Sequence, residues 1–188
     1  MRTGAYPGSF NPPTVAHLAI AEAAVEACRL DRVDLVVSRS ALGKDDVDVP
    51  RLEDRLAVLR EVGSTRPWLG VVLTEHRLLA DIAAGYDVVV MGADKWAQVL
   101  DPSWYGSVAE RDSALARLPE VVVAPRHDHR PDGVVLLEVP DHHLVVSSTE
   151  VRNGRSEWML PEAAAFDVRT GAWSDPGRYS RWIAAAGH

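Results

Sequence analysis

Cysteine is almost absent from this chain, and so are the features that mark exported, membrane and nucleic-acid-binding proteins. The single cysteine among 188 residues, Cys28, excludes an intrachain disulfide or a thiolate metal centre and favours a reducing cytoplasm. The sequence opens without a basic segment followed by an apolar one and contains no window of about 18 apolar residues, so we expect neither export nor membrane insertion. A net charge of -7 without a dense basic run argues against a nucleic-acid partner.

Two widespread phosphate-binding motifs are also missing. The sequence contains no G-x-x-x-x-G-K-[ST] segment, and Gly4 and Gly8 do not have the spacing of G-x-G-x-x-G. A P-loop and a dinucleotide fingerprint are therefore excluded, and a phosphate site in this chain must be built in another way.

The apolar residues, in contrast, are numerous enough for one well-filled core. Hydrophobic residues make up 47% of the sequence, which fits a single domain spanning 1–188. Short β-branched runs alternate with segments of helical periodicity, a pattern that predicts an α/β fold: a Rossmann-like, doubly wound parallel sheet with helices on both faces. The expected strands are 2–6, 33–38, 69–74, 87–92, 120–125 and 134–139, and the expected helices are 14–29, 51–63 (capped by Gly63), 75–84, 148–153 and 178–186.

The stretch YPGSFNPPTVAH, near the start of the chain, reads as a strand end, an irregular loop and the first turn of a helix. Thr14 is placed to cap this helix, and His17 follows on nearly the same side of the first turn. An isolated pair of this kind more often caps and packs a helix. The loop before it, with Gly8, Ser9 and Phe10, favours instead a phosphate held at the helix N-terminus.

A second segment of the same kind is VVSSTEVRN. Ser147, Ser148 and Thr149 follow an apolar strand end and can each cap a new helix, and Arg152 comes about one turn later as a bidentate cation. In a parallel α/β sheet, ligands lie at the carboxyl ends of the strands. Two anion sites at that edge would suit one extended polyphosphate, such as a nucleoside triphosphate.

Together with MGADKW between them, these motifs resemble the HxGH-motif nucleotidyltransferase superfamily, and most closely its nicotinate- or nicotinamide-nucleotide adenylyltransferases. The resemblance covers Tyr6 to Arg152. It implies transfer of AMP from Mg²⁺-bound ATP to a mononucleotide, with release of pyrophosphate, in cytoplasmic NAD biosynthesis. Phosphopantetheine or another acceptor, a cytidylyl donor, a catalytically weak ATP-binding or regulatory homologue, and a homo-oligomer all stay open.

The same resemblance implies a role for each motif residue. The first motif, the second motif and a lysine in the loop after the second strand would hold the phosphates of ATP. The middle segment, MGADKW, would hold the ribose or adenine. The aromatic side chains in and after that segment would hold the acceptor. The catalytic set is then His17, Thr14, Lys44 and Arg152; the nucleotide-binding set is Gly8, Ser9, Phe10, Gly92, Asp94, Ser147, Ser148 and Thr149; and the acceptor-binding set is Trp96, Trp104 and Tyr105.

Three departures from the family pattern bear on the acceptor and on activity. Ala16 stands where the family usually has glycine. Thr14 and the YPGSF start are similar to phosphopantetheine adenylyltransferases, and a Ser-Tyr-Thr-x-Asp-Thr segment typical of bacterial nicotinate enzymes is missing. The histidine pairs 127/129 and 142/143 have too few neighbouring ligands for a metal site, and we expect none.

Overall fold

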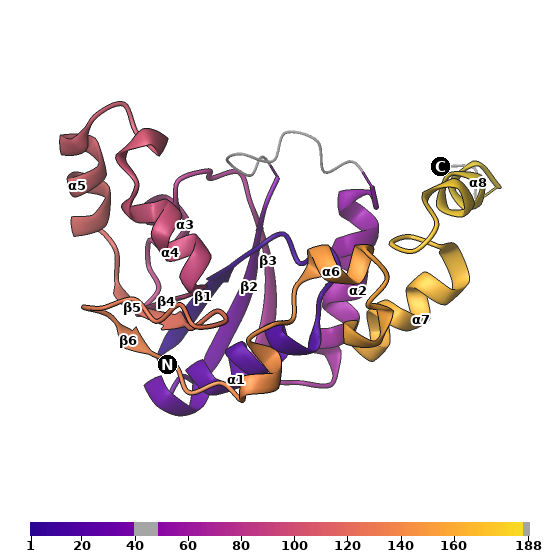
Figure 1. The fold of residues 1–188 in the computed structure, drawn as a ribbon, viewed down its shortest axis with the longest axis horizontal. Helices are drawn as coiled ribbons and strands as arrows, with labels where there is room; N and C mark the ends of the chain where they lie inside the picture. The colour runs from indigo at the N-terminus through magenta and orange to yellow at the C-terminus, as the bar shows by residue number, and fades with distance from the viewer. Residues whose placement is uncertain (40–48, 186–188) are drawn as a thin grey trace.

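One parallel sheet organises the part of the chain described by the computed structural model, residues 1–39 and 49–185. Its six strands lie in the order β3-β2-β1-β4-β5-β6, and every neighbouring pair is parallel (Figure 1). The predicted fold class is confirmed, whereas a single domain over 1–188 stays a prediction. The strands are β1 (Thr3–Pro7), β2 (Arg32–Ser38), β3 (Leu69–Thr74), β4 (Val88–Gly92), β5 (Glu120–Ala124) and β6 (Val135–Leu136).

Helices cover both faces of this sheet. On one face lie α1 (Val15–Cys28) and α2 (Leu52–Ser64), and on the other lie α3 (Leu79–Ile82), α4 (Ala93–Leu100) and α5 (Val108–Ala116). No helix among residues 1–39 and 49–185 has the length and apolarity needed to cross a membrane. The remaining elements are η1 (Pro102–Trp104), η2 (Asp141–His143), α6 (Ser148–Arg152), η3 (Ser156–Trp158), α7 (Pro161–Thr170) and α8 (Pro176–Ala185).

Strand β4 shows why the central strands read as unbroken apolar runs. Side chains alternate between the two faces of a strand, and here both faces are covered. Val88 and Val90 belong to the core beneath α1 and α2, while Val89 and Met91 belong to the core beneath α3 and α4. Because no face of β4 meets water, no polar residue interrupts it before the strand ends.

The strand order reverses at β1. From β1 the chain builds β2 and β3 on one side and then crosses to β4 on the other side, so β1 and β4 are neighbours. Such a reversal opens a crevice at the carboxyl ends of the two strands, where ligands of doubly wound folds bind. The first motif leaves β1 at this point and the MGADKW segment leaves β4.

Some predicted elements differ from the structure. The helix expected over 75–84 is reduced to the four residues of α3, because the chain stays extended as far as Leu78. The strand expected over 134–139 contains only the two residues of β6, at the edge of the sheet. Gly63 lies inside α2, which ends one residue later, and therefore does not cap it. Helices α4, α5 and α7 were not predicted.

The C-terminal helices α7 and α8 pack against α2 and form a smaller core of their own. Val58 of α2 lies there with Phe166, Trp173 and Tyr179, all buried. The hydroxyl of Tyr179 donates to Asp54 and accepts from the backbone N–H of Arg51 at 2.9 Å. The start of α2 is therefore tied to α8, beside the loop that carries the first motif.

Candidate active site

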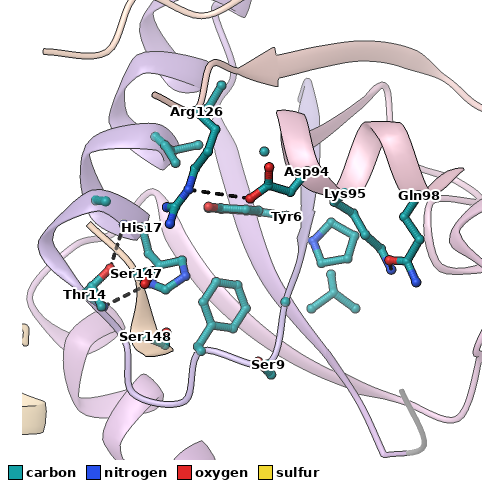
Figure 2. A pocket seen from close by; sticks show the side chains of 18 of the residues that line it. Tyr6, Ser9, Thr14, His17, Asp94, Lys95, Gln98, Arg126, Ser147 and Ser148 are labelled. Carbon is teal, nitrogen blue, oxygen red and sulfur yellow. Dashed lines mark hydrogen bonds and ion pairs between the residues drawn. The ribbon is translucent and has the colours of Figure 1, made fainter. Parts of the chain in front are cut away.

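A cleft of about 580 Å³ lies at the carboxyl ends of β1 and β4. This volume is in the range of small-molecule sites. The cleft is lined by both sequence motifs and by the MGADKW segment between them, so the fold brings together residues that are widely separated in the chain. Figure 2 shows Thr14 and His17 on one side of it, Ser147 and Ser148 beside them, and Asp94 with Lys95 opposite.

Thr14 and His17 form a reciprocal cap at the start of α1. The backbone N–H of His17 donates to Thr14 Oγ1 at 3.4 Å, and the backbone N–H of Thr14 donates to His17 Nδ1 at 3.0 Å. Because a backbone N–H can only donate, Nδ1 must carry a lone pair, and the proton of the neutral imidazole therefore lies on Nε2. The cap thus fixes both the orientation of His17 and the nitrogen that can donate to an anion.

The loop before this cap is held in a compact, unusual conformation. Phe10 has a φ of 44° and is 1% exposed, so the ring is locked in place although its backbone is in a region that non-glycine residues rarely adopt. A Cβ on Gly8 would lie 2.8 Å from this ring, which explains the glycine. The Phe10 ring meets the His17 imidazole edge-on, with centroids 5.0 Å apart, and so packs against this side chain.

The second motif begins α6 and is bonded directly to the first. Ser147 caps the helix by accepting from the N–H of Glu150 at 3.1 Å. Ser148 Oγ donates to the carbonyl of Pro12 at 2.7 Å, and the Arg152 guanidinium donates to the carbonyl of Asn11. Both bonds join segments more than a hundred residues apart in the chain. The two expected phosphate-binding motifs are therefore parts of one structure.

Arg126 is a site residue that the sequence reasoning missed. It follows β5 in the loop at the same edge of the sheet, and its guanidinium lines the cleft between the middle segment and the second motif. Arg126 Nε lies 3.5 Å from Asp94 Oδ2, and Nη1 donates to the carbonyl of Val146 at 2.7 Å (Figure 2). The available signal was its position directly after a predicted strand, at the edge where the motifs were expected.

Arg55 of α2 is a second missed residue. Its side chain lines the cleft, is 7% exposed and donates from Nη1 to the carbonyl of Ser9 at 3.3 Å. Burial lowers the pKa of the guanidinium, which nevertheless stays charged at neutral pH. Arg55 therefore adds a fixed positive charge behind the loop of the first motif.

The cleft is positively charged although the chain is not. Among the described residues that line it, six side chains are basic and one, Asp94, is acidic, whereas the whole chain has a net charge of -7. A concave site with walls of low polarity concentrates the field of such charges on an anionic ligand. The basic side chains are Arg39, Arg55, Arg77, Lys95, Arg126 and Arg152.

The expected acceptor-binding aromatics divide into two groups. Trp104 and Tyr105 line the cleft; the Trp104 side chain is 41% exposed, and the Tyr105 hydroxyl donates to the carbonyl of Val99 at 3.1 Å. Trp96 instead packs with the core beneath α4, because it comes two residues after Asp94 and so projects from the opposite side of that helix. Trp96 therefore does not line the cleft and is not part of the candidate site.

The other expected residues are placed as follows. Gly92 ends β4 as the N-cap residue of α4 and has open space where a Cβ would stand, as close approach of a ligand requires. Ala16 lines the cleft and is buried. Lys44 lies outside the described residues. In the part of the chain that is described, no group of three or more His, Cys, Asp and Glu side chains is arranged to hold a metal ion.

Comparison with known proteins connects this cleft to characterised families. The sequence profile described as cytidylyltransferase-like matches residues 5–154. Phosphopantetheine adenylyltransferase of Paracoccus denitrificans is 37% identical over 98 residues, which cover 49% of this chain and 57% of that protein. A probable nicotinate-nucleotide adenylyltransferase of Bordetella avium is 28% identical over 184 residues, covering 87% and 93%. The chain thus spans little more than half of the first relative and nearly all of the second.

Among solved structures, the fold is similar to a nicotinic acid mononucleotide adenylyltransferase of Plasmodium falciparum complexed with NaAD. The TM-score is 0.68 at 14% identity, and the alignment covers 89% of this chain and 95% of that one. At this identity the likeness concerns the fold, and it supports the doubly wound architecture described above.

Proposed function

The chain belongs to the cytidylyltransferase-like family, and from that premise we propose that it transfers AMP from ATP to the phosphate of a mononucleotide and releases pyrophosphate. The proposed acceptor is nicotinate or nicotinamide mononucleotide, which places the reaction in NAD biosynthesis. The single buried thiol, Cys28, favours the cytoplasm as its location.

The observation that carries the proposal is the bonded pair of anion sites. The N-termini of α1 and α6 both line one cleft and are joined by the bonds from Ser148 and Arg152 to the first loop. Helix N-termini with hydroxyl caps and nearby cations bind phosphate groups. Two of them beside each other suit an extended chain of phosphates better than a single phosphate.

The proposed reaction needs positioning and charge neutralisation more than it needs a nucleophile on the protein. A phosphate oxygen of the acceptor attacks the α-phosphorus, the bond from that phosphorus to the oxygen leading to the β-phosphate breaks, and pyrophosphate leaves. His17 would donate from Nε2 to the α- and β-phosphate oxygens beside Thr14. The Arg152 guanidinium would neutralise the charge that develops on the leaving pyrophosphate, and the backbone N–H groups of Ser148 and Thr149, at the start of α6, would donate to its oxygens.

Magnesium would come to this site bound to the phosphates of ATP. Asp94 is the one acidic side chain in the described lining, and a carboxylate cage for a free metal ion is not formed by the described residues. A magnesium ion supplies charge neutralisation of the phosphate oxygens when it is bound. The basic side chains of the cleft would neutralise the negative charge of the phosphates that the magnesium ion leaves uncompensated.

The proposed acceptor site lies around Trp104 and Tyr105. A pyridine ring is flat and suits stacking on the half-exposed face of Trp104, a contact worth about 1 kcal/mol beyond the burial of its area. Arg77 and Lys95 line the cleft as well and supply charge for the acceptor phosphate.

Phosphopantetheine is the second candidate acceptor. The Paracoccus relative and the threonine at position 14 favour it. A catalytically weak nucleotide-binding protein is the third reading, motivated by Ala16, whose methyl group occupies a position that is usually glycine in the family.

The test is release of pyrophosphate from ATP or CTP with nicotinate mononucleotide, nicotinamide mononucleotide or phosphopantetheine at equal concentrations. We expect turnover with ATP and a pyridine mononucleotide. A preference for phosphopantetheine would show that it is the acceptor in place of a pyridine mononucleotide. A preference for CTP would show that CTP is the nucleotide donor in place of ATP. ATP binding without turnover for any acceptor would leave the weak binding protein as the correct reading.

A further inference from the structure

A buried hydrogen bond joins the C-terminal region to the nucleotide loop. The indole N–H of Trp173 donates to Asn11 Oδ1 at 2.6 Å, and the two residues are 4% and 6% exposed. Asn11 belongs to the first motif. Trp173 lies in the turn between α7 and α8, beyond residues 5–154 that match the family profile.

The turn that carries Trp173 is rigid. Asp167 Oδ1 accepts from the backbone N–H of Trp173 at 2.6 Å and from that of Ser174 at 3.0 Å. Gly171 ends α7 with a φ of 78°, and a Cβ there would lie 2.8 Å from the carbonyl of Asp175. The indole also packs against Phe166, with ring centroids 5.9 Å apart. Its N–H is therefore presented at a fixed point.

Asn11 connects the Trp173 N–H, which is fixed in position, to the proposed phosphate site. Its carbonyl accepts from the guanidinium of Arg152, and the next carbonyl, that of Pro12, accepts from Ser148 at 2.7 Å. The bond from Trp173 therefore anchors Asn11 by its side chain, while the backbone of the same loop accepts from both second-motif residues. The side-chain amide of Asn11 is thus the link between the C-terminal turn and the catalytic arginine.

We propose that Trp173 is a positioning residue for nucleotidyl transfer, which acts through Asn11 to set the place of Arg152 at the polyphosphate. This inference rests on the proposed function. It gives the turn between α7 and α8, which lies outside residues 5–154, a role in positioning the residues of the cleft. The bond is buried from water, so its loss leaves Asn11 Oδ1 without this donor, and the bond of 3.4 Å from Asn11 Nδ2 to the carbonyl of Val49 is then the contact that holds the amide.

The predicted kinetic effect follows from geometry. Displacement of a positioning group by about 1 Å can cost a factor of about 100 in rate, and the loss of one of the bonds that anchor Asn11 should shift the loop by less than that. We expect Trp173→Phe, which keeps an aromatic ring and removes the N–H, to lower kcat about ten-fold. The KM of the acceptor should stay unchanged, because Trp104 and Tyr105 belong to the segment that follows α4 and not to the first loop or the second motif.

The experiment compares four variants with the wild type in pyrophosphate release, ATP calorimetry and thermal unfolding. Trp173→Phe and Asn11→Ala each remove the bond, and the double variant removes both partners. Trp182→Phe is the matched control, because Trp182 belongs to the same cluster and packs on Phe166 and Tyr179. If Trp173→Phe unfolds near the assay temperature, Asn11→Ala, which removes the same hydrogen bond, replaces it as the test variant.

The inference holds if both single variants lose about ten-fold in kcat, if the double variant loses no more, and if Trp182→Phe stays within two-fold of the wild type. It is overturned if Trp173→Phe matches Trp182→Phe in kcat, or if the two single losses multiply in the double variant. A wild type that neither binds ATP nor releases pyrophosphate would overturn the proposed function itself, and the inference with it.

Discussion

His17 allows stability and catalysis to be separated by substitution. Its Nδ1 accepts from the backbone N–H of Thr14, a residue with no exposed surface, while Nε2 is the donor proposed for the phosphates. Asparagine places an oxygen near the position of Nδ1 and has nothing at Nε2. Glutamine is one of the residues that complete a capping box three positions after the cap, so its oxygen can also accept from the N–H of Thr14. Alanine has neither group. Asparagine and glutamine therefore remove the Nε2 donor alone, and alanine removes both functions of the imidazole.

The expected magnitudes differ accordingly. Loss of one preorganised donor to a developing oxyanion costs about 2.7–4 kcal/mol, so His17→Asn should lower kcat by about 100- to 1000-fold with little change in Tm. An unpaired buried N–H costs about 1–3 kcal/mol, which is roughly 2–12 °C in Tm for a chain of this size. His17→Gln should likewise lose turnover and keep its Tm, whereas His17→Ala should lose turnover and also melt lower.

The assay is steady-state pyrophosphate release at saturating ATP, with Tm measured by calorimetry on the same samples. His17→Gln, which keeps the cap, is the control against a general loss of fold. Full turnover by His17→Asn would refute the role of Nε2, and a Tm of His17→Ala equal to that of His17→Gln would refute the reciprocal cap.

Three further predictions concern other parts of the molecule. Arg152→Lys should lower kcat at least ten-fold, because a point charge cannot replace a two-pronged guanidinium. Arg60→Ala, on the exposed side of α2, is the control and should have no effect on turnover. Equal turnover by Arg152→Lys and Arg60→Ala would contradict the role of Arg152. Trp104→Ala should raise the acceptor KM about five-fold, the equivalent of 1 kcal/mol, with an unchanged KM for ATP, measured by varying each substrate separately. Gly171→Ala should lower the free energy of unfolding by about 1–3 kcal/mol in urea titrations, since alanine is strained at a φ of 78°.

The sequence predicted the fold and the main motifs because those depend on local patterns. The alternation of β-branched runs and helical periods is local, and so is the cap at Thr14, whose partner is three residues away. Arg126 was missed because a single arginine in a histidine-rich loop has no local pattern that separates it from a solvated side chain. Only its neighbours in space, Asp94 and the carbonyl of Val146, identify it.

The C-terminal region was the least predictable part. Trp173 has no periodicity that points to Asn11, which is 162 residues away in the chain. The helix expected over 75–84 was wrong for the opposite reason. Its sequence suits a helix, but Leu78 is extended, and Ser38 Oγ at the end of β2 donates to the carbonyl of His76 at 2.6 Å. This tertiary contact overrode local preference there.

The hydrogen bond from Ser148 to Pro12 joins residues 136 positions apart, and this separation has a consequence for synthesis and turnover in the cell. The proposed triphosphate site is incomplete in a chain still emerging from the ribosome until α6 has been made and has closed onto the first loop. A proteolytic cut that releases the second half removes half of the proposed site in one step. If the nucleotide binds as proposed, it reports completed folding, and at a free concentration 100 times its Kd it stabilises the folded chain by about 2.7 kcal/mol.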